Sequence, residues 1–212
     1  MFGIGDYPVG LGLVESINRP GGNITGSISI GPTLGPKRVE LLHELIPNAV
    51  VVALLINPKQ PREFEPRDVE EKTHAFGWQL RRVAASSVSE FDAVFKTLAS
   101  ERIGGLIITN DAFFFGEIRR LAALASHHAV PAIGPLRAFA EGGGLMSYGA
   151  SIPEVWRHVG IYTGRIIKGA KPSELTVMQP SEWDLVINLK SAKTLGLTVP
   201  PTLLVLANQV IE

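Results

Sequence analysis

The stretch AVVVALLINP, residues 49–58, decides the fold class. It is an uninterrupted run of aliphatic and β-branched residues that ends at Asn57 and Pro58. Such a run is typical of a strand covered by helices on both faces, because both alternating sets of side chains are apolar. A second run, GGLIITND at residues 104–111, has the same character and also ends in polar side chains. The two runs predict buried strands of a parallel sheet.

Helix-like and strand-like segments alternate around these two runs at short spacing, as in a parallel α/β sheet. We predict one five-stranded α/β unit over residues 37–149. Helical periodicity occurs in residues 37–47, 67–78, 89–101, 115–129 and 136–143, and strand-like runs occur in residues 49–58, 79–85, 104–110, 130–134 and 144–149.

The segments on either side of this unit differ from it in composition and pattern. Residues 1–36 are rich in Gly and Pro around one predicted short helix at residues 11–17, and they resemble the end of a separate unit. Residues 150–212 contain a long helix at 153–168, an apolar strand at 184–189, a small helix at 190–196 and a final amphipathic stretch at 202–212. We therefore divide the chain into residues 1–36, 37–149 and 150–212.

Composition excludes several functional classes. Twenty basic residues balance twenty acidic ones without a run of like charges, so nothing indicates binding to nucleic acid or to anionic lipid. The absence of cysteine excludes thiol chemistry, disulfides and Cys-ligated metals. The sequence has no apolar run of about 18 residues and no signal peptide at its start. A neutral small molecule or a protein is the favoured partner.

Polar residues mark a candidate site at the ends of two predicted strands. In open parallel sheets, ligands bind beyond the carboxyl ends of the strands, where the connections change face. With the common strand order 2-1-3-4-5, this point lies between the first and third strands. Asn57, Asn110 and Asp111 would then face one crevice. The alternative is that Asn57 belongs to a turn and that Asn110 and Asp111 cap the next helix.

Other polar features carry no clear chemistry. His127 and His128 are adjacent near a helix end and point about 100° apart, so we assign no metal. The run EGGGL, residues 141–145, lacks the Lys-Ser/Thr of a phosphate-binding loop and is interpreted as a flexible join. Ser147 does not stand in a GxSxG motif, and no His and acid partners accompany it. We predict neither an enzyme nor a cofactor.

Several longer segments together resemble a known family. They are GLVESINRPGGNITG at residues 12–26, residues 37–58, LAALASHHAVPAI at residues 121–133, residues 143–175 and LVINLKSAKTLGLTVPPTLL at residues 185–204. In order and spacing they resemble the substrate-binding proteins of ABC importers, in the branch with a type I periplasmic-binding-protein fold that includes binders of aromatic amino acids. The resemblance extends over essentially the whole chain.

The resemblance implies a protein of two α/β lobes that close on a small solute and deliver it to a membrane permease. It implies a complete three-layer second lobe with flavodoxin-like strand order and an incomplete first lobe. An extracytoplasmic location is implied as well, although the chain has no signal peptide of its own. The solute-binding residues would be Asp6, Tyr7, Asn57, Asn110, Asp111, Phe113, Ser147 and Tyr148.

Two hypotheses follow from this resemblance. In the first, the chain is the solute-binding component of an ABC importer and takes an amino acid or a similar small solute. In the second, the shortened chain does not bind solute, and remnants of the first lobe pack on the intact lobe or form a homodimer. A third, an enzyme or sensor on a flavodoxin-like sheet, has less support because no catalytic residues were found.

Overall fold

The structure is a computed structural model that describes residues 1–5, 7–31, 34–59 and 64–212. It contains two compact units. The smaller unit combines Met1–Gly31 with Ala150–Trp183, and the larger unit combines Pro32–Gly149 with Asp184–Glu212. Each unit is thus assembled from segments that are distant in the sequence.

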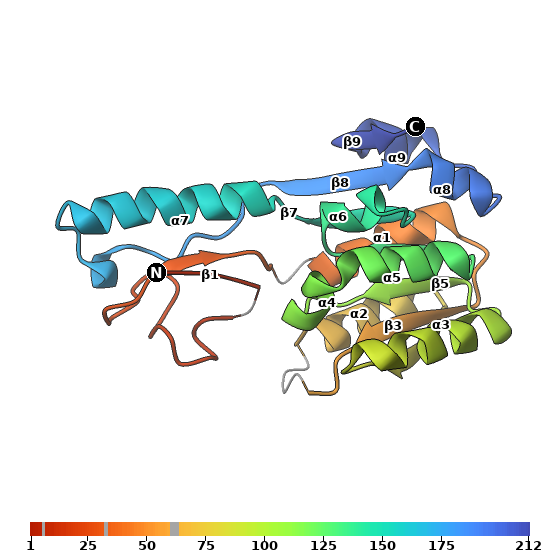
Figure 1. Ribbon diagram of the computed structural model, residues 1–212, viewed down its shortest axis with the longest axis horizontal. Helices are drawn as coiled ribbons and strands as arrows, with labels where there is room; N and C mark the ends of the chain where they lie inside the picture. Colours follow the sequence, from red (N-terminus) through yellow and green to blue (C-terminus); the bar gives the residue numbers. More distant parts are fainter. Residues whose placement is uncertain (6, 32–33, 60–63) are drawn as a thin grey trace. The chain divides into compact units, whose positions relative to one another are not determined.

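Within the described residues, the larger unit is built on a seven-stranded sheet with the order β4-β3-β5-β6-β7-β8-β9 (Figure 1). The pairs from β4 to β7 are parallel, and so are β8 and β9. The order of the first five strands confirms the predicted 2-1-3-4-5 arrangement. The strands are β3 (Val51–Ile56), β4 (Gln79–Ala84), β5 (Gly105–Ile108), β6 (Ala132–Gly134), β7 (Met146–Ala150), β8 (Trp183–Asn188) and β9 (Gln209–Ile211).

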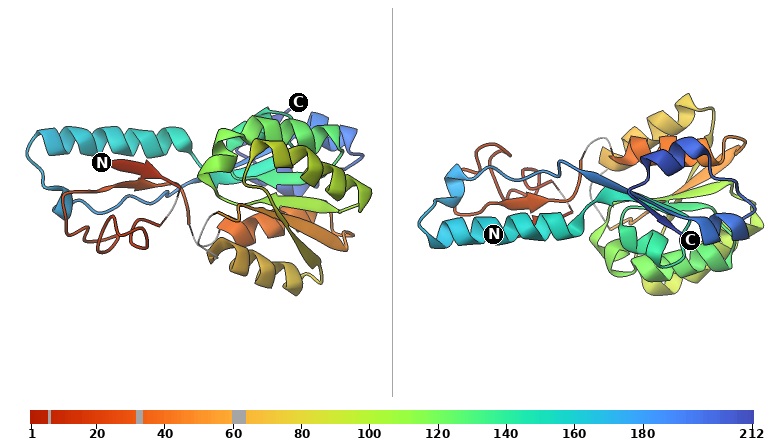
Figure 2. Two further views of the ribbon diagram at one scale, coloured as in Figure 1. Left: turned by 60° about the horizontal axis from the view of Figure 1, so that its bottom comes forward. Right: turned by 90° about the horizontal axis from the view of Figure 1, so that it is seen from above.

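Helices cover both faces of this sheet and complete three layers (Figure 2). One face carries α1 (Leu34–Leu45), α2 (Phe64–Ala75), α8 (Leu189–Thr194) and α9 (Pro201–Leu206). The opposite face carries α3 (Phe91–Ser100), preceded by the short 3-10 turn η1 (Val88–Glu90), and then α4 (Ala112–Gly116), α5 (Ile118–His127) and α6 (Arg137–Glu141).

Strand alternation explains why the core has two halves. In β3, Val52 and Leu54 belong to the cluster under α1 and α2, whereas Ala53 and Leu55 belong to the cluster under α3 and α5. All four side chains are fully buried. Successive side chains of a strand point to opposite faces, so a strand covered on both faces must be apolar throughout. This is the property that residues 49–58 show in the sequence.

The smaller unit has a parallel two-stranded sheet among its described residues, formed by β1 (Phe2–Ile4) and β2 (Gly26–Ile28). The long helix α7 (Ile152–Ile167) and the 3-10 turn η2 (Pro172–Glu174) belong to the same unit. Val14, Ile28 and Val177 form its small buried cluster. This unit therefore has far less core than the larger one.

Two predictions about the end of the chain were wrong. The larger unit was expected to have five strands, but β8 and β9 extend its sheet. Residues 184–212 therefore join the larger unit and do not form one segment with residues 150–183. The predicted amphipathic stretch at 202–212 divides into α9 and β9, because the backbone becomes extended at Ala207 (ψ 130°).

Three local predictions were also wrong. The described residues show no helix at 11–17, where the chain forms turns around Gly12 in the left-handed region (φ 70°). The predicted helix at 115–129 divides into α4 and α5 at Glu117. The EGGGL run, predicted to be a flexible join, ends α6. Gly143 is left-handed (φ 96°), and Gly144 N donates to Phe139 O at 2.9 Å. The run therefore forms a helix cap inside the larger unit.

Candidate functional site

The candidate site lies at the carboxyl edge of the larger sheet. Strands β3 and β5 are neighbours there, with Leu55 beside Ile108 in register. The chain leaves β3 toward α2 on one face and leaves β5 toward α4 on the other. This is the point at which the connections change face, and Asn57 and Asn110 follow the two strands directly.

Asn57 and Asp111 form a closed pair at this point. Asn57 Nδ2 donates to both carboxylate oxygens of Asp111, at 3.2 and 3.1 Å, and Asn57 Oδ1 accepts from the backbone N–H of Lys59 at 3.0 Å. Asp111 is the N-cap of α4, and its Oδ1 also accepts from the N–H groups of Phe113 at 2.8 Å and Phe114 at 3.3 Å. Asp111 is 3% exposed. Its carboxylate therefore holds the end of β3 to the start of α4.

Asn110 is held by a residue that the sequence analysis missed. Arg38 of α1 is fully buried, and its Nη2 donates to Asn110 Oδ1 at 2.9 Å. Arg38 Nε donates to Tyr148 O at 2.8 Å, and Nη1 contacts Ile108 O at 3.5 Å. One guanidinium thus joins α1 to the ends of β5 and β7.

The sequence contained a signal for Arg38. Leu34, Arg38, Leu42 and Leu45 follow one another at helical spacing, and all four are buried. Arginine in an apolar helical stripe needs polar partners, because an unpaired buried charge is strongly unfavourable. Its presence in that stripe therefore indicated a buried polar network whose other members were unknown.

Ser147 and Tyr148 lie in β7 with different surroundings. Ser147 is fully buried, and its Oγ has no hydrogen-bond partner within the described part of the chain. Tyr148 is half-buried and packs against the cluster under α1. Burial raises the pKa of the Tyr148 phenol, and the charges of Lys37 and Arg38 oppose this rise. Tyr148 is thus the member of this pair with exposed surface.

The three consecutive phenylalanines after Asp111 occupy different environments. Phe114 is fully buried in the cluster under α3 and α5. Phe113 is half-buried and stacks on Phe91, with ring centroids 5.4 Å apart and planes at 27°. Phe115 is also half-buried. Because Phe114 anchors the short helix, Phe113 is left at the carboxyl edge with part of its ring accessible.

Of the predicted site residues that remain, Tyr7 belongs to the smaller unit. Tyr7 follows β1, and its carbonyl accepts from the N–H of Leu11 at 3.1 Å. Asp6 lies outside the described residues. The structure therefore brings together Asn57, Asn110, Asp111, Phe113 and Tyr148 at one edge of the larger sheet, whereas Tyr7 belongs to a separate unit.

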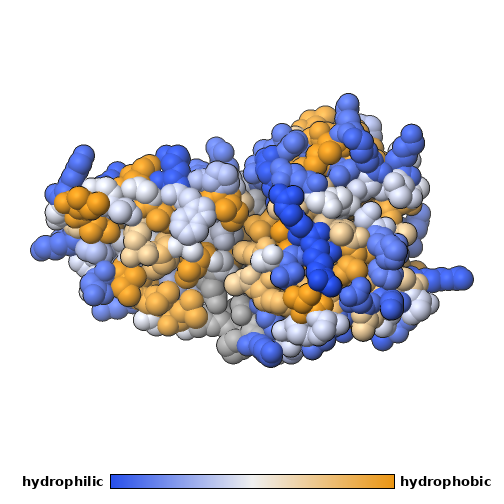
Figure 3. Space-filling model, viewed as in Figure 1, coloured by the Kyte–Doolittle hydropathy of each residue, from blue (hydrophilic) through white to orange (hydrophobic). Residues whose placement is uncertain are grey.

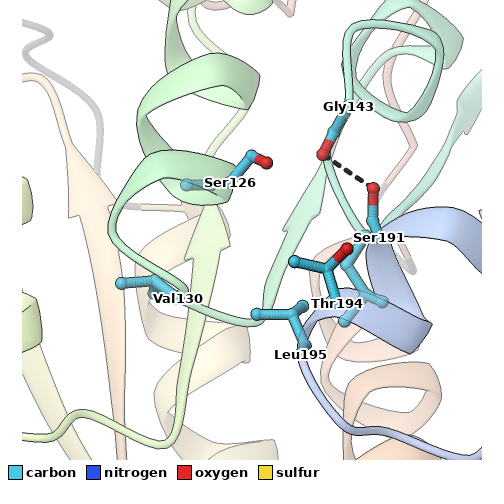
Figure 4. A pocket seen from close by; sticks show the side chains of 8 residues that line it. Ser126, Val130, Gly143, Ser191, Thr194 and Leu195 are labelled. Atoms are coloured by element: carbon cyan, nitrogen blue, oxygen red, sulfur yellow. Dashed lines mark hydrogen bonds between the residues drawn. The ribbon is translucent and has the colours of Figure 1, made fainter.

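A small pocket lies at the other edge of the larger sheet (Figure 4). It is lined by the end of α5, the turn before β7 and helix α8. Ser191 Oγ donates to Gly143 O across it at 2.8 Å. Leu195 and Val130 add apolar walls. These residues stand near the amino ends of β6 and β7, so the pocket is not part of the switch-point site.

Among the residues that the structure describes, no group of three or more His, Asp or Glu side chains is arranged to hold a metal ion. No helix in the described ranges is both long enough and apolar enough to cross a membrane.

The larger unit thus has the architecture of a ligand-binding lobe of the type I periplasmic-binding-protein fold, with polar side chains at the switch point of a three-layer α/β sheet. The chain belongs to the ABC transporter substrate-binding protein family. The family model described as ABC transporter substrate binding protein matches residues 1–211. This is a family of solute-binding proteins that act outside the cytoplasm.

Solved structures and a curated relative support the assignment. A protein of Streptococcus pneumoniae, described as an ABC domain in complex with L-Trp, is 26% identical with a TM-score of 0.86 over 97% of this chain. A conserved domain protein of Vibrio cholerae is 25% identical with a TM-score of 0.85 over 96% of this chain. A tyrosine-binding protein of Clostridioides difficile is 22% identical over 194 residues, or 90% of this chain.

The relatives are longer than this chain. The match covers 54% of the curated C. difficile protein, 69% of the S. pneumoniae chain and 68% of the V. cholerae chain. The chain therefore spans about half the length of the curated relative.

Proposed function

We propose that this chain is the extracytoplasmic solute-binding component of an ABC importer and that its solute is an aromatic amino acid or a closely similar molecule. The solute would be held between the two units, with the carboxyl edge of the larger sheet as one wall. The protein with its bound solute would then deliver the solute to permease subunits in the membrane. No bond is made or broken in this function, so no catalytic group is required.

The observation that carries the proposal is the composition of that edge. Asn110 offers a polar group, and the accessible parts of Phe113 and Tyr148 offer apolar ring surface beside it. Small-molecule sites combine apolar and aromatic lining with a few fixed polar groups. The relatives described as binding tryptophan and tyrosine favour an aromatic amino acid as the solute.

Titration calorimetry on the purified chain tests the proposal. The panel contains the twenty amino acids, and we expect heat with L-tryptophan or L-tyrosine. Asn110→Ala should weaken that binding by about tenfold, because it removes a hydrogen bond to a charged or polar solute group. Asn48→Ala is the matched control, because Asn48 is exposed just before β3, at the opposite end of that strand. Absence of binding to every amino acid would refute the proposal.

A second candidate function rests on the surface of the smaller unit. Figure 3 shows hydrophobic residues on this unit, and Trp156, Ile161 and Ile167 of α7 are exposed large apolar residues. A two-stranded sheet with one long helix is a small basis for independent stability. Exposed apolar surface of this kind favours a chain that folds without binding solute and associates with itself.

Light scattering after size-exclusion chromatography separates the two candidates. A monomer that binds an amino acid supports solute binding. A dimer or larger species with a cooperative melt and no solute binding supports the second candidate. Trp156→Ser should then reduce the association, because it removes an exposed apolar side chain.

A further inference from the structure

Helix α7 of the smaller unit presents an open side to solvent. Its exposed large apolar side chains are Trp156, Ile161 and Ile167, with 57%, 41% and 80% of their surface accessible. Gly160 and Gly164 lie among them at helical spacing, and a Cβ atom added at either glycine would have open space around it. These five residues form what we call the outer face of α7.

Positive charge accompanies the outer face of α7. Arg157 and Arg165 of the helix and Lys168 at its C-cap are exposed, and their spacing places them in one row along the helix. Glu154 is the one acidic side chain of α7, and it already lies 3.6 Å from Arg157 and 3.9 Å from His158. Apolar side chains and an excess of cations therefore share this side of the helix.

The helix is what gathers these cations. They are three to eight positions apart, so the sequence shows no run of like charges. Neither Arg165 nor Lys168 has a carboxylate within ion-pair distance among the residues that the structure describes. Their charges are consequently available to a partner that carries negative charge.

A second copy of this chain fits the outer face of α7 less well than its apolar residues alone suggest. If α7 packed against α7 of another copy, Arg157, Arg165 and Lys168 of each helix would approach the same cations of the other. Like charges brought together at an interface oppose association. An occupant with negative groups above an apolar interior satisfies both parts of this surface.

We propose that the outer face of α7 lies on the surface of an anionic lipid membrane. Anionic headgroups attract lysine and arginine side chains near the bilayer surface, and tryptophan is favoured at the boundary between headgroups and acyl chains. With 16 residues the helix is about 24 Å long and would lie along the surface. The inference needs no bound solute. It adds to the proposed function a contact that would keep the protein close to a membrane permease.

Co-sedimentation with lipid vesicles tests the proposal. Vesicles of phosphatidylcholine alone are compared with vesicles of equal amounts of phosphatidylcholine and phosphatidylglycerol. Wild-type protein should bind the anionic vesicles at least about tenfold more tightly, because each cation near the surface contributes about fivefold. Raising the salt concentration to about 0.5 M should remove most of this preference, because it shortens the range of the attraction to about 4 Å.

Two substitutions test whether the outer face of α7 makes this contact. Trp156→Ser and Lys168→Glu should each weaken binding to anionic vesicles by about fivefold or more. Val205→Ser and Lys193→Glu are the matched controls, because Val205 and Lys193 are exposed on helices of the larger unit, and both should bind as wild type does. A thermal melt by circular dichroism checks that each variant is folded.

Tryptophan fluorescence provides a second measurement. Trp156 is the most exposed of the three tryptophans. Its emission should therefore shift to shorter wavelength when anionic vesicles are added, and the shift should be absent in Trp156→Ser.

The other outcomes would overturn the proposal. Equal binding to both kinds of vesicle, or binding to neither, would exclude an anionic lipid partner. Wild-type binding by both Trp156→Ser and Lys168→Glu would place the membrane contact elsewhere. A dimer that binds no vesicles and becomes a monomer in Trp156→Ser would make this face an interface between copies. Vesicle binding by a protein that binds no amino acid would leave this inference standing and refute only the proposed solute binding.

Discussion

Replacing Phe114 by alanine should destabilise the larger unit far more than the same change at Phe113. Phe114 is fully buried among Phe91 and other side chains under α3 and α5, with 6.2 Å between the Phe114 and Phe91 ring centroids. Removing a fully buried phenylalanine ring costs about 3–5 kcal/mol, which combines lost transfer free energy with the cavity left behind. We expect Phe114→Ala to lie in this range.

The expected loss at Phe113 is smaller for two reasons. Its ring is only half-buried, so about half of the usual 1.5–3 kcal/mol of burial free energy is at stake. The stacked contact with Phe91 adds about 0.5–1.5 kcal/mol. The sum is about 1.3–3 kcal/mol. The order reverses for solute binding, because Phe113 is the ring with accessible surface at the candidate site.

Urea unfolding followed by circular dichroism measures both losses. With an m-value of about 2 kcal/mol per molar urea, Phe114→Ala should lower the midpoint by about 1.5–2.5 M and Phe113→Ala by about 1 M. Phe95→Ala is the control, because Phe95 is fully buried in the same cluster but belongs to α3, so it should match Phe114→Ala. Equal losses at Phe113 and Phe114 would refute the assignment of Phe114 as the anchor of α4.

Three further predictions concern single side chains. Ala129, which follows α5, has a left-handed backbone (φ 52°). Ala129→Gly should therefore raise the free energy of unfolding by about 0.5–1 kcal/mol. Ala123→Gly, in the exposed part of α5, should lower it by a similar amount. Ser147→Ala should leave the free energy of unfolding unchanged or raise it by up to about 1 kcal/mol, because the buried Ser147 hydroxyl has no partner among the described residues. Ser191→Ala loses a hydrogen bond and should lower the free energy of unfolding by about 1 kcal/mol. The pKa of Glu40 is lowered mainly by a hydrogen bond from a lysine, so the stability it contributes is complete above the ordinary value of 4.5 and is lost as pH falls through the lower folded value. The melting temperature should therefore fall more steeply for wild type than for Glu40→Gln between about pH 6 and pH 3, the range around ordinary carboxyl pKa values. Parallel curves for the two proteins would contradict this prediction.

The layers of the larger unit were predictable because their signals are local. A strand covered on both faces must be apolar at every position, and residues 49–56 and 104–108 satisfy this without reference to any partner. Helices α1, α3 and α5 carry apolar residues at helical spacing, and each begins or ends within a few residues of its predicted position. The switch point followed from strand order alone, and Asn57 and Asn110 lie at that point in the structure.

Elements at the chain ends were predicted less well, because their form depends on packing. The three residues of β9 are too few to show a strand period, and they extend because β8 offers them a parallel partner, with Val186 beside Gln209 and Asn188 beside Ile211. Likewise, residues 11–17 have apolar side chains at helical intervals, but Gly12 interrupts them and adopts a backbone angle that ends a helix.

Hydrogen-bond partners were the least predictable part of the site. Asn110 and Arg38 are 72 positions apart, and Asn57 and Asp111 are 54 apart, so nothing in either local sequence shows who bonds to whom. An asparagine after a strand can cap, turn or bind, and the three uses have the same local signature. Only the register of the folded sheet decides which of these three roles each asparagine has.

The same partners decide whether the charge of Asp111 is available to a solute. In the sequence, Asp111 is the charged residue among the three polar residues predicted at the carboxyl edge of the larger sheet. In the structure, Asn57 and two backbone N–H groups satisfy that carboxylate, and it is buried. Arg38, a buried cation, donates to Asn110 Oδ1 at 2.9 Å. Asp111 therefore acts as the N-cap of α4, which is the alternative that its position directly after β5 left open.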